Sequence, residues 1–111
     1  MATVAYLDID QGSDFIVSMN LENDDGTPMD LYQYTVHSQF RKSYNSTTGY
    51  NFTCAVIDPT NGIISISLPG SESSLIPAGR YLYDIEIASV SVKVRVLEGI
   101  IVLTPEITRI P

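Results

Sequence analysis

The sequence of 111 residues contains one cysteine, Cys54, and one histidine, His37. A single cysteine excludes an intramolecular disulfide and any metal site made of several cysteines. A single histidine leaves no His-rich ligand set for zinc, and the sequence contains no GxSxG, HExxH, GxGxxG or P-loop motif. We therefore expect a protein that is not an enzyme and that has no catalytic residues, no bound metal and no cofactor.

Basic residues are also scarce. Six lysines and arginines stand against 13 acidic residues, which gives a formal net charge of -7. Binding to phosphate backbones or to anionic membranes needs clustered basic side chains, and here they are scattered. The sequence has no window of about 20 apolar residues, and its N-terminus lacks the basic and apolar regions of a signal peptide. We expect neither nucleic acid nor a membrane among the partners.

Helical periodicity is missing as well, because no segment of about ten or more residues repeats its apolar positions about every 3.6 residues. The dominant period is two, which is typical of strands with one buried and one solvated face. This alternation occurs in the segments 15–22, 33–42, 50–57, 62–68, 81–87 and 90–96. With the strand-like segments 3–9 and 99–105, the pattern predicts a single all-β sandwich domain over residues 1–111.

Turn signals separate these segments. Asn61-Gly62 fits a tight turn with positive φ and predicts a hairpin between the strands around Val56 and Ile64. The sequence Ser-Glu-Ser-Ser-Leu that begins at Ser71 predicts a single helical turn with Ser71 as its N-cap. Alternate valines in the segment 90–96 predict a strand with a buried valine face.

The segment 75–87, Leu-Ile-Pro-Ala-Gly-Arg-Tyr-Leu-Tyr-Asp-Ile-Glu-Ile, combines a Pro/Gly turn with a strand. Tyr81 lies where immunoglobulin-like and fibronectin-III-like sandwiches carry a tyrosine that hydrogen-bonds back to the preceding turn. Tyr83, Ile85 and Ile87 continue the same face. Burial explains all four residues, whereas a ligand-stacking surface explains only the tyrosines. The corner favours an immunoglobulin-like or fibronectin-III-like sandwich of about seven to eight antiparallel strands.

The last strand is apolar on both of its faces, and it allows two interpretations. Its candidate interface residues are Ile100, Ile101, Val102 and Leu103, followed by Pro105 and the terminal Ile110-Pro111. A free edge of this composition invites strand pairing or symmetric packing with another subunit. A strand covered on both faces within the monomer has the same composition.

Other residues that could take part in catalysis or metal binding have simpler interpretations. His37 alternates to the solvent face of its strand, and Cys54 shares the buried face of its own, where it acts as a small hydrophobe. Asp24, Asp25 and Asp30 flank Gly26, but their spacing is not that of a calcium-binding EF-hand loop, so we interpret this segment as an acidic strand connector. Tyrosines near turns are the candidates for recognition by loops, because exposed aromatic rings stack on sugars. They are Tyr32, Tyr44 and Tyr50.

The order of these segments resembles a family of small β-sandwich modules from tailed-bacteriophage virions. The family includes the N-terminal module of baseplate upper proteins and stand-alone virion structural proteins. The segments that carry the resemblance, in chain order, are 11–15, 23–43, 50–68, 75–87 and 92–109. The last segment contains an Arg-x-Leu-Glu-Gly step that leads into the final strand.

The resemblance implies a virion structural protein of the tail or baseplate that is made in the bacterial host cytoplasm. Its implied work is docking to other virion proteins through sandwich edges and loops, with further copies of itself as homo-oligomer partners. The resemblance transfers no catalytic residues. A carbohydrate- or receptor-binding β-sandwich is the second interpretation, based on Tyr32, Tyr44 and Tyr50.

Overall fold

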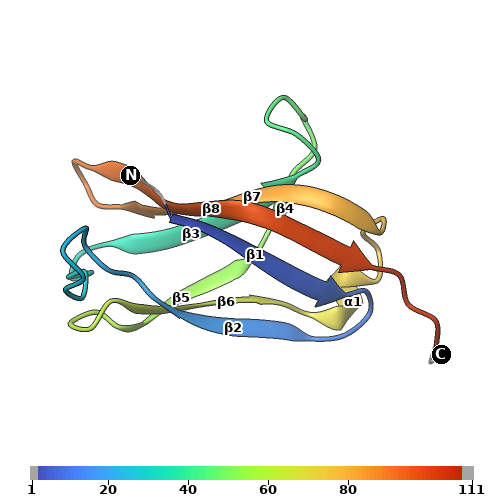
Figure 1. Ribbon diagram of the computed structural model, residues 1–111, viewed down its shortest axis with the longest axis horizontal. Coiled ribbons are helices and arrows are strands. Elements are labelled where there is room, and N and C mark those ends of the chain that lie inside the picture. The colour runs from blue at the N-terminus through green and yellow to red at the C-terminus, as the bar shows by residue number, and fades with distance from the viewer. Residues whose placement is uncertain (1–2, 109–111) are drawn as a thin grey trace.

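The computed structural model describes residues 3–108, which form two packed β-sheets and one helical turn (Figure 1). The elements are β1 (Thr3–Asp10), β2 (Phe15–Asn20), β3 (Thr35–Arg41), β4 (Tyr50–Asn51), β5 (Thr53–Asp58), β6 (Ile63–Leu68), α1 (Gly70–Ser73), β7 (Gly79–Ala88) and β8 (Lys93–Thr104). Within this range no helix is long and apolar enough to span a bilayer.

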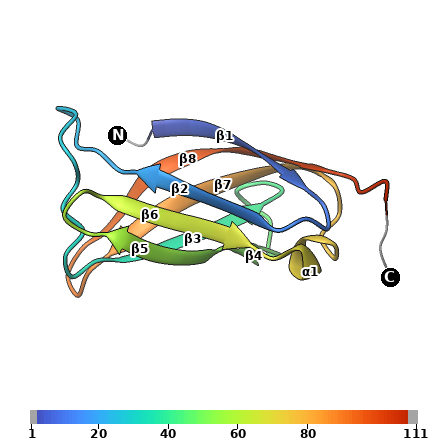
Figure 2. The same cartoon turned by 90° about the horizontal axis from the view of Figure 1, so that it is seen from below.

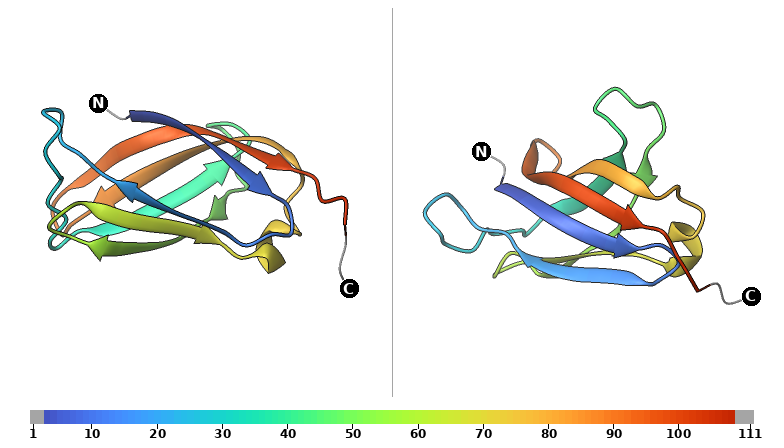
Figure 3. Two further views of the ribbon diagram at one scale, coloured as in Figure 1. Left: turned by 60° about the horizontal axis from the view of Figure 1, so that its bottom comes forward. Right: turned by 45° about the vertical axis from the view of Figure 1, so that its right-hand side comes forward.

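The two sheets confirm the predicted β-sandwich. One sheet has the order β1-β8-β7-β3-β4, and the other has the order β2-β6-β5. The adjacent strands β8, β7 and β3 correspond to G, F and C of an immunoglobulin sandwich, and β2, β6 and β5 correspond to B, E and D. The views in Figure 3 show the two layers stacked, with the described ends of the chain at opposite ends of the molecule.

One strand pair departs from the expected antiparallel arrangement. β1 pairs with β8 in parallel, from Thr3 opposite Leu97 to Asp10 opposite Thr104. The parallel pair forms because the chain leaves β1 through a tight turn into β2 of the other sheet, and β8 returns along the open side of β7. Gly99 permits the close approach, since a Cβ atom there would overlap the backbone carbonyl of Ala5.

The core lies between the sheets and follows the predicted alternation. Residues on the inner faces are buried or half-buried, and their neighbours along each strand are more exposed. Aromatic rings connect the two layers. The ring centroid of Phe15 on β2 lies 6.0 Å from that of Phe52, which lies 5.0 Å from the ring centroid of Phe40 on β3. Tyr81 on β7 continues this chain of rings at 5.3 Å from Phe40, edge to face. Such pairs add to the stabilisation from buried area.

The predicted tyrosine corner is present. Tyr81 is 1% exposed, and its hydroxyl donates a hydrogen bond to the carbonyl of Pro77 in the turn before β7. The ammonium group of Lys42 lies 4.4 Å from the centroid of the Tyr81 ring on the other side. Burial raises the pKa of the Tyr81 hydroxyl, so the group stays a hydrogen-bond donor.

The hairpin predicted at Asn61-Gly62 is also present. β5 and β6 pair antiparallel, and Gly62 has φ +68°, a conformation that favours glycine. The carboxylate of Asp58 accepts a hydrogen bond of 2.8 Å from the Asn61 side chain and closes the turn.

The predicted N-cap of the helical turn is wrong. α1 begins at Gly70, and no side chain of its own segment caps it. Instead, the carboxylate of Asp14, on the β1–β2 turn, accepts a 2.7 Å hydrogen bond from the Gly70 amide. The buried hydroxyl of Ser73 accepts a 2.9 Å bond from the Gly12 amide. A residue far away in the sequence therefore replaces the local cap.

The predicted buried valine face is wrong for most of its length. Val90, Val92 and Val94 are 106%, 44% and 43% exposed. Residues 89–92 form the β7–β8 turn, closed by a hydrogen bond from the Ser89 amide to the Val92 carbonyl, so side chains there lie beyond the paired strands. The β7–β8 register also shifts between Ile85 and Glu86, which interrupts the alternation.

We predict that Tyr81→Phe lowers the free energy of unfolding by about 1 kcal/mol, because it leaves the Pro77 carbonyl without its donor. Tyr83→Phe is the matched control. The Tyr83 hydroxyl is buried and has no hydrogen-bond partner among the described residues, so its removal leaves stability unchanged or increases it. Urea unfolding of both variants measures the difference, and equal destabilisation by the two changes would contradict the corner's role.

Candidate functional site

The free-edge interpretation of the last strand is wrong. β8 lies between β1 and β7 and is hydrogen-bonded to both. Ile101 and Leu103 are buried in the core, at 0% and 1% exposure. Ile100 and Val102 point to the outer face of the five-stranded sheet, where Ile100 is half-buried and Val102 is 40% exposed. Of the four candidate interface residues, only Ile100 and Val102 therefore retain access to a partner. The terminal Ile110-Pro111 lies outside the described residues.

The three candidate tyrosines do not form one surface. Tyr32 precedes β3 and is 61% exposed, and its hydroxyl accepts a hydrogen bond from Thr60. Tyr44 lies on the loop after β3, at the other end of the strand, and is 73% exposed. Tyr50 is half-buried and packs on Phe40 at 5.2 Å, so it belongs to the core. This arrangement leaves Tyr32 and Tyr44 as separate exposed rings.

The other residues singled out in the sequence have local roles. Asp25 accepts hydrogen bonds from the Thr27 amide and hydroxyl within the β2–β3 loop, and these bonds lower the pKa of its carboxyl. Asp30 accepts a bond from the Tyr32 amide. Burial raises the pKa of the half-buried Cys54 thiol. Across residues 3–108 no group of three or more His, Cys, Asp or Glu side chains is arranged to hold a metal ion.

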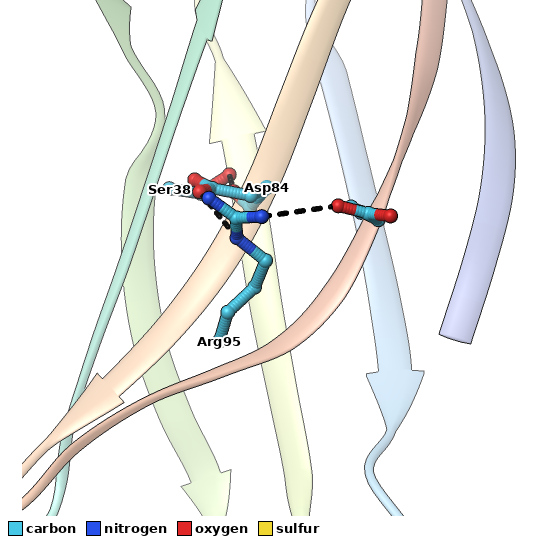
Figure 4. A network of polar contacts seen from close by, with 4 residues as sticks. Ser38, Asp84 and Arg95 are labelled. Carbon is cyan, nitrogen blue, oxygen red and sulfur yellow. Dashed lines mark hydrogen bonds and ion pairs between the residues drawn. The ribbon is translucent and has the colours of Figure 1, made fainter. Parts of the chain in front are cut away.

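An ionic network lies on the outer face of the five-stranded sheet (Figure 4). The Arg95 guanidinium on β8 contacts the Asp84 carboxylate on β7 at 3.1 Å and the Glu98 carboxylate at 3.2 Å. Asp84 and Glu98 are direct cross-strand neighbours, so Arg95 offsets the repulsion between two like charges. The nearly buried hydroxyl of Ser38 donates a 2.6 Å hydrogen bond to the Asp84 carbonyl and ties the network to β3.

The surroundings of Asp84 change its proton affinity. Burial raises the pKa of its carboxyl above the ordinary value of 3.8, and the nearby Glu86 carboxylate raises it further. The Arg95 cation lowers it, but burial and the neighbouring carboxylates together raise it more. The folded protein therefore holds this proton more tightly than the unfolded chain does.

A shallow cavity of about 310 Å³ surrounds this network, and we call it the charged trough. His37, Tyr44, Asp84 and Arg95 are among the residues that line it. The loop between β3 and β4 rises beside it as the protruding green loop in Figure 1. Arg95 is already paired with two carboxylates, whereas Arg41 and Glu86, which also line the trough, form no ion pair among the described residues. The trough therefore offers charged and polar groups together with one exposed ring.

The opposite surface of the molecule has a different composition, and sequence reasoning missed it. The outward side chains of the three-stranded sheet form three cross-strand rows. They are Ile16, Ser67 and Thr53; Ser18, Ser65 and Ala55; and Asn20, Ile63 and Asp58, where a bulge leaves the exposed Ile57 beside the row. Apart from Asp58 at one corner, none of these side chains carries a charge, and we call the uncharged part of this surface the neutral face. Figure 2 shows the three-stranded sheet toward the viewer, with no other described element across it.

Charge is thus divided between the two outer surfaces. In the three-stranded sheet only Asp58, the last residue of β5, is charged, and it is held in the β5–β6 turn by Asn61. The five-stranded sheet carries the ionic residues of β1, β3, β7 and β8 on its outer side. Alternation in each strand shows which side chains face outward, but only strand adjacency shows that the uncharged ones combine into one surface.

Comparison with known proteins identifies no family. No protein-family model and no curated protein matches the chain. Among solved structures, the crystal structure of Listeria monocytogenes InlP is similar to 92% of this chain, with a TM-score of 0.49 and 9% sequence identity. The chain spans 26% of the length of that structure. A similarity at this level assigns no function.

We predict that NMR titration places the pKa of Asp84 above 3.8 in the folded protein. Arg95→Met raises it further, because the cation that lowers it is lost, and Glu86→Gln lowers it. Since the folded pKa exceeds the unfolded one, the contribution of Asp84 to stability decreases as pH rises from about 3.8 through the folded value. A wild-type value at or below 3.8 would contradict the conclusion that burial and the neighbouring carboxylates outweigh the ion pair with Arg95.

Proposed function

We propose that the protein is a non-enzymatic structural component of a phage virion that docks to neighbouring subunits. The resemblance of its segments to virion sandwich modules supports the assignment to a tail or baseplate, and the neutral face supports docking. Its partners are other virion proteins and further copies of itself, with neither nucleic acid nor membrane among them. The protein is made in the bacterial host cytoplasm and becomes part of the particle.

The observation that carries docking is the absence of charge on the neutral face. The solvated surface of a small domain usually mixes charges of both signs, which keeps the domain soluble. The centre of an interface is depleted in charge, because an unpaired charge loses its hydration when a partner covers it. This chain has a net charge of -7, and yet one of its sheet surfaces is almost uncharged. That surface therefore has the composition expected of one that a partner covers.

The charged trough favours a second candidate function, the binding of a carbohydrate or receptor. Tyr44 is 73% exposed and lines the trough together with Gln39 and several ionic side chains. An exposed ring beside hydrogen-bonding groups suits the apolar face and the hydroxyls of a sugar. The single ring is a smaller feature than the neutral face, so docking ranks first.

We predict that purified particles of the phage that encodes the chain contain it at a fixed number of copies per particle. Quantitative mass spectrometry of gradient-purified virions measures this number, and cryo-electron microscopy locates the sandwich in the particle. Its absence from intact particles, while the protein is abundant in the lysate, would overturn the proposed function.

The second candidate has its own test on a glycan array. Binding that Tyr44→Ala abolishes and Tyr32→Ala preserves would favour the carbohydrate function, because Tyr32 is also an exposed ring but lies at the other end of β3, outside the trough. If the wild-type protein binds no glycan on the array and is present in particles, docking remains the proposed function.

A further inference from the structure

The neutral face has the shape of a sheet that packs on another sheet. Its middle row consists of the small residues Ser18, Ser65 and Ala55, so a second backbone can approach closely. Isoleucines stand at two diagonal corners, where Ile16 is 73% exposed and Ile57 is 59% exposed. Sheets that pack face to face lie about 10 Å apart and bury side chains of this size between them.

Electrostatics restricts how two copies of this chain can meet. Each copy carries a net charge of -7, so two copies repel each other wherever their acidic residues come close. The nearest carboxylate of the same sheet is Asp58, which pairs with Ile63 at one corner of the neutral face and is hydrogen-bonded to Asn61. At physiological salt, charges more than about 8 Å apart are largely screened. Contact centred on the neutral face therefore brings fewer charged residues together than contact through the five-stranded sheet does.

The chemistry of the face is also self-complementary. In a two-fold contact the same patch meets itself, so each group has to tolerate its own copy. Hydroxyls such as those of Ser18, Ser65 and Thr53 both donate and accept hydrogen bonds, and isoleucine side chains pack on one another. A charged side chain near the two-fold axis would meet a like charge in that arrangement, and the central row of the face contains none.

We propose that the neutral face is a two-fold contact between two copies of this chain. The proposal rests on the docking function and names the partner of that surface. With three strands of six residues, the face measures roughly 15 Å by 20 Å. This footprint is smaller than the roughly 800 Å² that each partner buries in a stable pair. The single contact is weak, and repetition in a symmetric particle strengthens it.

Cross-linking traps such a weak contact. Ser65 lies at the centre of the face, and we use Ser65→Cys in a Cys54→Ala background, so that the introduced thiol is the only one in the chain. A short bis-maleimide is expected to convert most of this variant to covalent dimer within minutes. The matched control, Gln39→Cys on the exposed outer side of β3, stays monomeric. Equal cross-linking of both variants, or of neither, overturns the proposal.

Charge variants test the same contact without cross-linking. In sedimentation velocity, Ser65→Glu and Ser65→Lys each raise the dimer dissociation constant about tenfold or more, because like charges meet across the two-fold axis. A mixture of the two variants regains association, while Gln39→Glu behaves as wild type. Circular dichroism confirms that each variant is folded. If the wild-type protein stays monomeric at millimolar concentration, the proposed self-contact is contradicted.

The two proposals fail separately. If particles contain the chain at fixed stoichiometry and incorporate Ser65→Glu as well as wild type, the docking function is supported and the self-contact is contradicted. A cross-link from Ser65→Cys to a different virion protein has the same meaning, because another partner then occupies the face. Absence from particles removes the docking function, whatever the cross-linking result.

Discussion

The contact between Tyr81 and the turn before β7 holds the two layers of this protein in register. The hydroxyl is bonded to the Pro77 carbonyl, and the ring packs edge to face on Phe40, which in turn contacts Phe52 at the crossover from β4 to β5. The chain changes sheets both before β7 and between β4 and β5, so these aromatic contacts determine where the layers meet. The outward surfaces of both sheets follow from that placement.

Those outward surfaces have opposite electrostatic character. On the five-stranded sheet, Arg95 lies between Asp84 and Glu98, and the carboxyl of Asp84 has a raised pKa because it is partly buried beside Glu86. On the three-stranded sheet, serines, isoleucines and other uncharged residues form the neutral face. The separation leaves the acidic character of the chain on the surfaces that stay in water. It leaves the uncharged sheet as the surface that loses least hydration when a partner covers it.

Much of the fold was predictable from local patterns. Alternation placed Ile64 and Ile66 in the core, Asn61-Gly62 predicted the β5–β6 turn, and the corner residues predicted the role of Tyr81. The errors concern long-range effects. Asp14 caps α1 in place of Ser71, and pairing with β1 excludes the free edge that was one of two interpretations of the apolar segment 100–103. Each of these partners is remote in sequence, so no short window contains it.

The sequence by itself determined which side chains of most strands point inward, because side-chain direction alternates with the local backbone. Only the tertiary structure decided which strands are neighbours. That choice placed β8 between β1 and β7, and it joined the outward residues of β2, β6 and β5 into the neutral face. The physical reason is that strand pairing depends on the free energy of the whole core, and on contacts between segments that are distant along the chain.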